Sequence, residues 1–197
     1  MRTFTKDELK YILDNHKKWL NNEDGGERAD LRGSDLRGSD LRWSDLRWSD
    51  LRGSDLRWSD LSWSDLRWSD LSGSDLSGSK IDDKLLAKFF PIACPESGSF
   101  IGWKKAKDKI VKLEICDDAK RSSAFSRKCR CSAAKVLAIE NIDGTDSGLN
   151  EIASDYNNDF IYRVGESVSV DDFDEDRKKE CAPGIHFFIT RQEAVDW

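Results

Sequence analysis

The sequence predicts a coiled repeat domain that is capped by an N-terminal helix and followed by a small α+β domain. Three observations lead to this fold class. A five-residue period runs without interruption from Ala29 to Asp83, an amphipathic segment with a helix-capping pattern precedes it, and strand signals begin soon after it ends. The 197 residues suffice for one or two domains of this kind.

Residues 1–28 are expected to form a capping helix and a short segment that leads into the repeats. Thr5 and Glu8 have the spacing of a capping box, in which each side chain bonds to the backbone N–H of the other residue. The residues that follow recur at helical spacing, so the helix has one apolar face to cover the first coil. His16 lies on or near this face and is expected to be packed rather than to bind a ligand. The face consists of Leu9, Ile12, Leu13, His16 and Leu20.

Residues 29–83 are eleven consecutive five-residue repeats. The central residue is Leu in ten of them and Ile81 in the last. The residue two places earlier is Ala29 once and Ser ten times, and the residue between is Asp in every repeat but the last. A period of five fits neither the 3.6 residues of a helical turn nor the alternation of a flat strand. It fits a backbone that turns a corner in every repeat.

This pattern resembles the pentapeptide-repeat family, whose consensus is a small residue, Asp or Asn, Leu and two variable positions. The resemblance implies a right-handed quadrilateral β-helix with four repeats per coil, in which the Leu and the small residue point inward. Eleven repeats then make about 2.75 coils, or roughly 13 Å at about 4.8 Å per coil. Ser stands where the family usually has Ala, so each inward hydroxyl needs a backbone partner.

Four repeats per coil place residues twenty apart in one column and gather the tryptophans on part of the surface. Trp43 then lies over Trp63, Trp48 lies over Trp68, and Trp58 lies on a third face. One interpretation is that Asp and Arg pair as a solvated face while Trp covers their stems. The other is an interaction surface for a second copy or a foreign protein, since Trp and Arg are typical anchors of protein contacts. Its residues would be Trp43, Trp48, Trp58, Trp63 and Trp68.

Residues 84–197 are expected to form the α+β domain. Its charge is divided along the chain: residues 102–135 carry eleven Lys or Arg against four Asp or Glu, and residues 136–183 carry four against thirteen. The two halves could pair with each other. Alternatively, the basic half could bind a phosphate, for which the composition of the loop Lys120–Lys128 is suited. Helices are predicted at Lys84–Phe90 and from Arg191, and strands at Lys109–Cys116, Ala134–Glu140, Phe160–Val164 and Ile185–Thr190.

This second part of the chain resembles an uncharacterised family that follows pentapeptide repeats in phages and large viruses. Together with the repeats, the resemblance covers nearly the whole chain. It implies a phage source and carries no established activity. The matching phrases are Phe100–Lys105, Ile110–Ile115, Lys120-Arg121-Ser122, Lys128-Cys129-Arg130, Phe160–Glu166 and Cys181–Phe188.

Composition excludes several classes of protein. A net charge of −6 and a pI near 5.1 argue against direct nucleic-acid binding. No apolar run approaches the roughly 18 residues that span a bilayer, and the first ten residues lack the core of a secretory signal, so a cytoplasmic location is expected. Five cysteines, an odd number, favour reduced thiols over a disulfide framework.

Neither a catalytic nor a metal site is predicted. Cys181 and His186 could suggest a nucleophile and base, but no motif with a defined nucleophile turn accompanies them. Cys129 and Cys131 could join them around a metal, but the usual two-residue spacing between paired cysteines is missing. No cofactor fingerprint is present.

We therefore expect a non-catalytic protein that binds an anionic, nucleotide-type small molecule. With the implied phage source, it would act in the host cytoplasm against host defence, by sequestering a nucleotide signal or by blocking a defence protein. Trp103 or Tyr162 would stack on a base, and the cations would hold phosphate. The expected ligand-binding residues are Trp103, Lys104, Lys105, Arg121, Ser122, Arg130, Tyr162 and His186.

Two alternatives belong to other classes. One is a protein-binding or homo-oligomeric scaffold that uses the Trp columns. The other, implied by the pentapeptide-repeat resemblance, is mimicry of duplex DNA toward a topoisomerase or another DNA-binding protein. DNA would place about eight charges over 13 Å, whereas residues 29–83 carry twelve acids and eight bases. An enzyme is the option with the least support.

Overall fold

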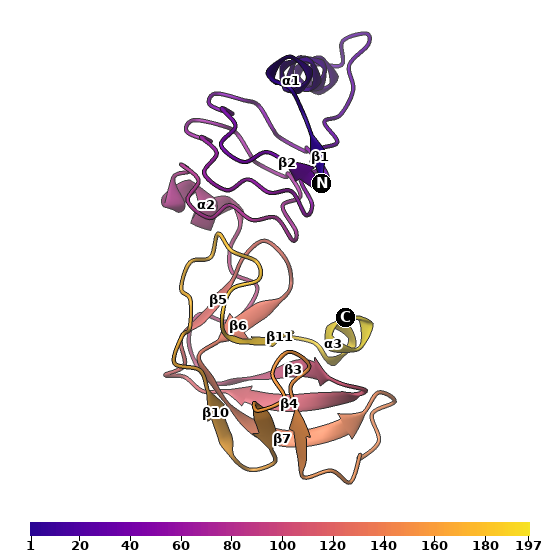
Figure 1. Ribbon diagram of the computed structural model, residues 1–197, viewed down its shortest axis with the longest axis vertical. Coiled ribbons are helices and arrows are strands. Elements are labelled where there is room, and N and C mark those ends of the chain that lie inside the picture. The colour runs from indigo at the N-terminus through magenta and orange to yellow at the C-terminus, as the bar shows by residue number, and fades with distance from the viewer. The chain divides into compact units, whose positions relative to one another are not determined.

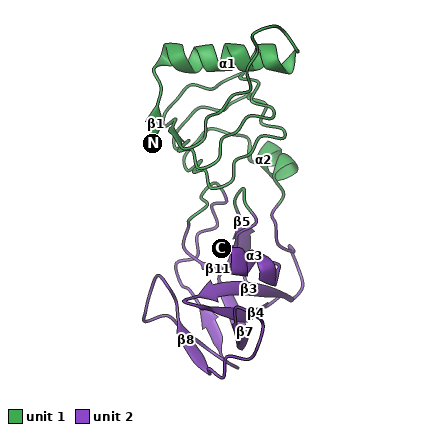
Figure 2. Ribbon diagram, turned by 90° about the vertical axis from the view of Figure 1, so that its right-hand side faces the viewer, with its two compact units in different colours: residues 1–91, 124–126, 178–181 green, residues 92–123, 127–177, 182–197 purple.

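The computed structural model describes residues 1–197 and divides them into two compact units (Figure 2). The sequence placed the domain boundary between residues 83 and 84, whereas the first unit continues to Pro91. No helix is long and apolar enough to cross a membrane. Unit 1 comprises residues 1–91, 124–126 and 178–181, and unit 2 comprises residues 92–123, 127–177 and 182–197.

Unit 1 begins with strand β1 (Arg2–Thr3) and helix α1 (Lys6–Leu20) (Figure 1). The Thr5 hydroxyl accepts a hydrogen bond from the Glu8 N–H at 3.2 Å, and the Glu8 carboxylate accepts one from the Thr5 N–H at 2.7 Å. The predicted capping box is thereby confirmed. Figure 2 shows α1 lying across one end of the coils, where Leu9 joins the core of the repeats.

His16 fastens α1 to the repeats, and its packed role is confirmed. The ring is fully buried. Its Nε2–H donates to the carbonyl of Arg47 at 2.8 Å, and its Nδ1 accepts from the backbone N–H of Ala29 at 3.1 Å. These two bonds require the neutral tautomer with the proton on Nε2. Burial lowers the pKa of His16, which favours the same form.

The repeats stack with a period of twenty residues, as four repeats per coil require. Parallel bridges join Asp30 to Asp50 and Asp50 to Asp70, and the other columns follow the same pattern. The only longer pairing is between β1 and strand β2 (Ser34–Asp35). The ladder therefore consists of single bridges rather than long strands, because the backbone turns between one bridge and the next. The central Leu of all ten Leu repeats is buried.

A tight turn forms each corner. The Ser N–H that begins a repeat donates to the preceding Leu carbonyl, as Ser34 does to Leu31 at 3.3 Å. The residue just before this Ser has a positive φ in ten repeats, and it is either Gly or Trp. The inward Ser hydroxyls mostly bond to the same Leu carbonyl, while those of Ser54 and Ser79 have no partner.

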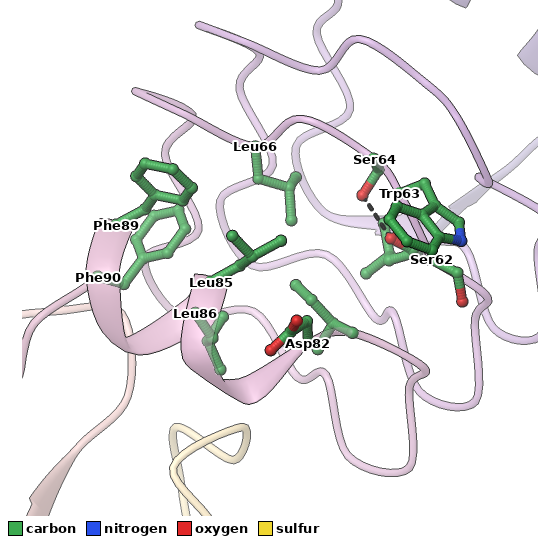
Figure 3. A pocket seen from close by; sticks show the side chains of 11 residues that line it. Ser62, Trp63, Ser64, Leu66, Asp82, Leu85, Leu86, Phe89 and Phe90 are labelled. Atoms are coloured by element: carbon green, nitrogen blue, oxygen red, sulfur yellow. Dashed lines mark hydrogen bonds between the residues drawn. The ribbon is translucent and has the colours of Figure 1, made fainter.

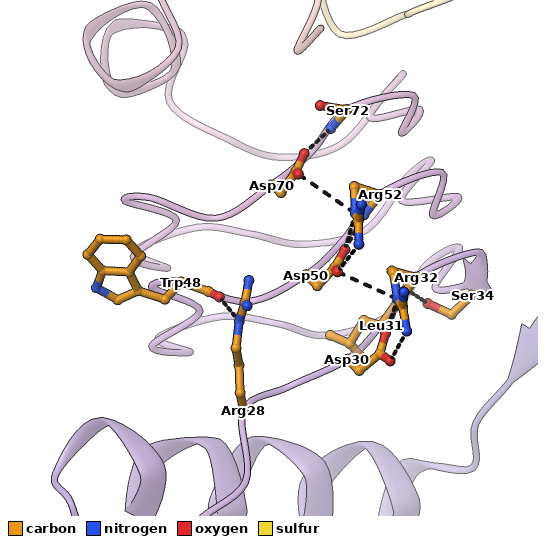
Figure 4. A network of polar contacts seen from close by, with 10 residues as sticks. All are labelled: Arg28, Asp30, Leu31, Arg32, Ser34, Trp48, Asp50, Arg52, Asp70 and Ser72. Carbon is orange, nitrogen blue, oxygen red and sulfur yellow. Dashed lines mark hydrogen bonds and ion pairs between the residues drawn. The ribbon is translucent and has the colours of Figure 1, made fainter.

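Asp and Arg form ion-pair ladders along the coils, as one interpretation of the sequence proposed. Arg32 contacts Asp30 in its own repeat at 2.6 Å and Asp50 one coil on at 3.5 Å, and Figure 4 shows this ladder continuing through Arg52 to Asp70. All seven Arg residues of the repeats pair with the Asp two residues earlier. Hydrogen bonds from these Arg side chains lower the pKa of three carboxyl groups to about 2: Asp30, Asp35 and Asp40.

The other end of the coils is covered by helix α2 (Asp83–Phe89) and by two later segments of the chain. The helix predicted here is confirmed; it begins one residue earlier, after the N-cap Asp82, whose carboxylate accepts from the Lys84 N–H at 2.8 Å. The carbonyl of Lys178 accepts from the Leu76 N–H at 2.9 Å, in the place where a further coil would pair. The ring of Phe125 packs edge-on against Phe90.

Unit 2 is built from antiparallel sheets. One sheet has the order β10-β7-β4-β3, a second has the order β11-β6-β5, and β8 pairs with β9. Apolar side chains between the sheets form the core. Position 102 requires glycine, because a Cβ atom there would be 2.7 Å from the Phe187 ring. The elements are β3 (Phe100–Ala106), β4 (Lys109–Ile115), β5 (Arg121–Ser123), β6 (Cys129–Cys131), β7 (Ala133–Asn141), β8 (Glu151–Ala153), β9 (Ile161–Arg163), β10 (Ser167–Ser169), β11 (Ile185–Phe187) and α3 (Arg191–Asp196).

The four strands predicted in this region are confirmed as β4, β7, β9 and β11, and the predicted last helix is confirmed as α3. Five strands were not predicted. Four of these have three residues each, too few to show an alternation, and β3 contains a glycine and two lysines. The prediction that Lys120–Lys128 is a flexible loop is wrong, because β5 occupies residues 121–123 and pairs with β6.

Candidate anion-binding site

Unit 2 contains a cavity of about 400 Å³, which we call the basic cavity. Strand β3 contributes two lysines to it and the turn after β3 contributes a third. The fourth lysine immediately precedes β6, and a histidine lies in β11. The volume lies within the roughly 300–1,000 Å³ typical of small-molecule sites. The lining residues are Lys104, Lys105, Lys107, Lys128, Asp155, Tyr156, His186, Phe188 and Trp197.

Lys104 is the most unusual residue of the basic cavity. Its side chain belongs to a strand whose alternate residues are buried, and the residue is only 8% exposed. Its Nζ makes no hydrogen bond within the chain and lies 6.0 Å from the centre of the Tyr162 ring. Burial lowers the pKa of Lys104, an effect that the nearby Asp155 carboxylate opposes. The residue is buried while its ammonium lines the cavity without a hydrogen-bond acceptor from the chain, so a bound anion could supply that acceptor.

The other three lysines differ in their contacts. Lys105 donates one hydrogen bond from Nζ to the Val195 carbonyl at 3.2 Å. Lys107 donates from Nζ to the Asn158 side chain at 3.3 Å. The Nζ of Lys128 lies 4.6 Å from the centre of the Trp197 ring, a cation–π contact. An ammonium has three N–H groups, so the single Nζ hydrogen bonds of Lys105 and Lys107 leave donors for an anion.

The pKa of His186 reflects the positive charge around the basic cavity. Its Nε2–H donates to the Ala182 carbonyl at 3.0 Å, which leaves Nδ1 as an acceptor. Burial, followed by the charges of Lys128 and Lys104, lowers the pKa of His186 to about 4. The ring is therefore neutral at pH 7. Four lysines line the basic cavity, and Asp155 is the one residue among its lining residues with an acidic side chain.

Aromatic rings form part of the wall. Tyr156 is 85% exposed and Trp197 is 62% exposed, although both line the basic cavity. The rings of Phe188 and Trp197 contact each other with centroids 5.3 Å apart. Exposed rings beside cations suit a ligand that combines a planar group with negative charge.

Three of the eight predicted ligand residues, Lys104, Lys105 and His186, line the basic cavity. Two others lie beside it without lining it. Trp103 pairs its backbone with Phe188 and packs in a small cluster on α3. Tyr162 is buried in the main core, beneath the Nζ of Lys104.

The remaining three predicted residues have structural roles, and we remove them from the proposed site. The Arg121 guanidinium donates to backbone carbonyls, among them those of Gly98 at 2.9 Å and Cys116 at 2.7 Å. Arg130 is only 1% exposed and donates to the carbonyls of Asp174 and Asp176. Ser122 is buried and is paired with Arg130 between β5 and β6. These arginines hold loops in place, and neither of them lines the basic cavity.

Sequence reasoning missed six lining residues. Lys128 lay within the basic segment that the sequence singled out, so its composition was a usable signal. Lys107 is a turn residue with a left-handed backbone, and no periodic pattern marked it. The others come from loops and from the residue after α3, which only the fold brings together. The six are Lys107, Lys128, Asp155, Tyr156, Phe188 and Trp197.

The thiols do not form a metal centre. No group of three or more His, Cys, Asp or Glu side chains could hold a metal ion. Cys129 and Cys131 are buried in the core, and burial raises the pKa of Cys131 to about 12, which disfavours the thiolate that a metal requires. None of the five cysteines forms a disulfide.

The five repeat tryptophans remain exposed, with 48–73% of each residue accessible. Trp43 stacks on Trp63 with ring centroids 5.4 Å apart, and Trp48 stacks on Trp68 at 5.1 Å. The Trp58 ring lies over Gly78, where a Cβ atom would be 2.5 Å from Cδ1 of the indole. The columns deduced from the twenty-residue period are therefore present.

The repeats and the second unit each match a known family model. Residues 27–62 and 39–78 match pentapeptide repeats, described as eight copies, which imply a β-helix. Residues 90–194 match a family of unknown function, DUF5758. This second match covers more than half of the chain, and the chain belongs to that family. No curated protein matches the chain.

Proposed function

We propose that unit 2 binds a small organic anion of the nucleotide type in the basic cavity, without catalysing a reaction. The observation that carries this proposal is Lys104, a buried residue whose ammonium has no hydrogen bond within the chain and lines a cavity with three further lysines. We further propose that unit 1 is a right-handed, four-sided β-helix that serves as the platform for this domain.

The chemistry of the ligand follows from the wall of the basic cavity. Phosphate oxygens would accept hydrogen bonds from Lys104, Lys105 and Lys128, and such charge-assisted bonds contribute about 1.5–3 kcal/mol each. A planar base would contact the exposed rings of Tyr156 and Trp197. The neutral His186 offers Nδ1 as an acceptor for a ligand N–H or O–H. An anion without a ring, or a ring without charge, would use only half of these contacts.

Thermal unfolding with a panel of ligands tests the proposal. The panel holds ADP, ADP-ribose and cyclic dinucleotides, with inorganic phosphate and adenosine as the two halves of a ligand. A nucleotide at one hundred times its dissociation constant adds about 2.7 kcal/mol of stability. We expect a shift with at least one nucleotide, a smaller one with either half, and loss of the shift in Lys104→Met and Lys128→Met.

The surface variant Lys120→Met is the matched control and should keep the shift, because Lys120 is exposed and pairs with Glu175. An equal loss in all three lysine variants would show that general charge is responsible and would contradict the proposed site. So would the absence of a shift across the whole panel.

The biological role that the resemblance to phage and viral proteins suggests is a proposal of its own. By sequestering a nucleotide signal, the chain would disable a host defence that depends on it. Expression in bacteria that carry such a defence should restore phage growth, and Lys104→Met should not. Equal restoration by both forms would exclude sequestration in the basic cavity and would favour the alternative of blocking a defence protein.

DNA mimicry is less well supported by the repeats. Seven of their carboxylates are paired with arginines of the same repeat, so little of the negative charge is left uncompensated. A large stoichiometric excess of the protein should therefore leave DNA gyrase activity unchanged. Inhibition or protection of the enzyme at equimolar protein would reverse this conclusion.

A further inference from the structure

One surface of unit 1 has features that the ion-pair ladders do not explain. We propose that it takes a second copy of this chain and makes the protein a dimer. The surface consists of residues 43–48 and 63–68, which have the same sequence, Trp-Ser-Asp-Leu-Arg-Trp. The two segments lie one coil apart, joined by the bridge between Asp45 and Asp65. We call this surface the twin-Trp face.

The tryptophans of the twin-Trp face have a strained backbone. Trp43, Trp48, Trp63 and Trp68 all have φ between 60° and 64°, the left-handed region that glycine occupies in five other repeats. A residue with a Cβ atom is strained there, because the Cβ approaches the following carbonyl oxygen. One stacked pair of rings stabilises less than its two strained residues cost. Stacking within the chain therefore does not offset the strain, which Trp58 on another face shares.

The exposed area of the twin-Trp face suits a protein contact. Trp43 and Trp63 are each 73% exposed, and the two rings of the other column are about half exposed. At about 150–250 Å² per aromatic side chain, the four rings offer roughly 400–600 Å². The Asp and Arg side chains between the two Trp columns add further area, and a stable interface buries about 800 Å² per partner.

The charge pattern of the twin-Trp face is complementary to itself. Across each coil, the outward residues read Trp, Asp, Arg, Trp, because Leu46 and Leu66 point into the core. A two-fold axis that runs along the direction in which the coils stack reverses this order, so that each Asp meets an Arg and each Trp meets a Trp. Arg47 and Asp65 are about one third exposed and can form this second contact. No other two stacked repeats carry this pattern, because Ser62 replaces Arg in residues 58–63.

The apolar surface continues past Trp63 into a second cavity of about 250 Å³ (Figure 3). Figure 3 shows Trp63 on one side of this cavity and helix α2 on the other, with Leu66 and Leu85 between them. Leu85 and Phe89 of α2 are themselves partly exposed. A second copy on the twin-Trp face would therefore cover apolar groups on α2 as well as on the repeats.

Light scattering on the full chain after size-exclusion chromatography tests the proposal. The expected mass is about 45 kDa, twice the 22.5 kDa of the chain. Replacing all four tryptophans of the twin-Trp face with Gly should give the monomer mass without unfolding, because Gly adopts a positive φ at little cost. The control Trp58→Gly removes an exposed, left-handed Trp from another face and should remain a dimer.

A second variant keeps the test decisive if the four-Gly chain does not fold. Arg47→Glu with Arg67→Glu sets acid against acid across the two-fold axis and should weaken the dimer at least about tenfold, less so at high salt. A monomer mass for the unaltered chain up to millimolar concentration would overturn the proposal. A dimer that persists in the folded Trp and Arg variants would overturn it equally.

Discussion

Lys104→Met separates the stability of unit 2 from its binding function. The substitution keeps the long side chain and removes an ammonium that lacks a hydrogen bond and whose pKa is lowered by burial of the residue. Because burial disfavours the charged form, removing it should raise the free energy of unfolding by about 1–3 kcal/mol. For a chain of this length, each kcal/mol raises the melting temperature by about 2–4 °C.

The same substitution should weaken binding of the anion. Loss of one charge-assisted hydrogen bond costs about 1.5–3 kcal/mol, or roughly a 10- to 150-fold decrease in affinity. It should also raise the pKa of His186 above its value of about 4, because the Lys104 charge contributes to lowering it. The chain has only two histidines, so the His186 ring can be followed by NMR during a pH titration.

Lys104→Met should therefore change three measured quantities: it should increase stability, weaken anion binding and raise the pKa of His186. The matched control Lys120→Met should change none of them appreciably. If Lys104→Met is less stable than the unaltered chain and His186 titrates as before, the Lys104 ammonium is not a charge that burial destabilises.

Three further predictions concern pH, packing and backbone. The pKa of His186 is about 4 in the folded chain and 6.5 in the unfolded chain. As the pH falls from 6.5 to 4, the unfolded state therefore takes up a proton that the folded state does not, and the free energy of unfolding decreases. His186→Gln should remove about 3 kcal/mol of this decrease in denaturant titrations. An identical pH dependence in both proteins would refute this. Leu51→Ala, at a fully buried position, should cost about 2–5 kcal/mol in chemical denaturation, whereas the half-exposed Leu85→Ala should cost far less; equal costs would contradict the assigned core. Gly53→Ala should cost about 1–2 kcal/mol for its left-handed backbone alone. Gly78→Ala should cost more because of the Trp58 ring, and a double-mutant cycle with Trp58→Gly should recover that excess; a cycle without coupling would be inconsistent with the contact.

Local signals predicted unit 1 well. Thr5 and Glu8 marked the start of α1, and the five-residue period gave the columns of Leu, Asp and Trp that the bridges and stacked rings confirm. The left-handed backbone of the tryptophans was not predicted, because a positive φ at a bulky residue runs against its intrinsic preference. The repeat imposes that conformation at the corner, whichever residue is present.

The site in unit 2 was harder to predict because its residues come from distant parts of the sequence. Lys104 and Lys105 were found from the basic composition of their segment, and His186 from its place in a predicted strand. Arg121 and Arg130 shared that composition, but their guanidinium groups bond to backbone carbonyls in loops. Composition identifies a basic region; only the pairing of strands decides which cations line a cavity.

The pKa of His186, measured by NMR with and without ADP, tests the anion site directly. We expect ADP to shift the ring signals and to raise this pKa from about 4 toward 6.5, because the anion compensates Lys128 and Lys104 beside the imidazole. An unchanged pKa with ADP, and likewise with the other nucleotides of the panel at millimolar concentration, would contradict an anion site in the basic cavity.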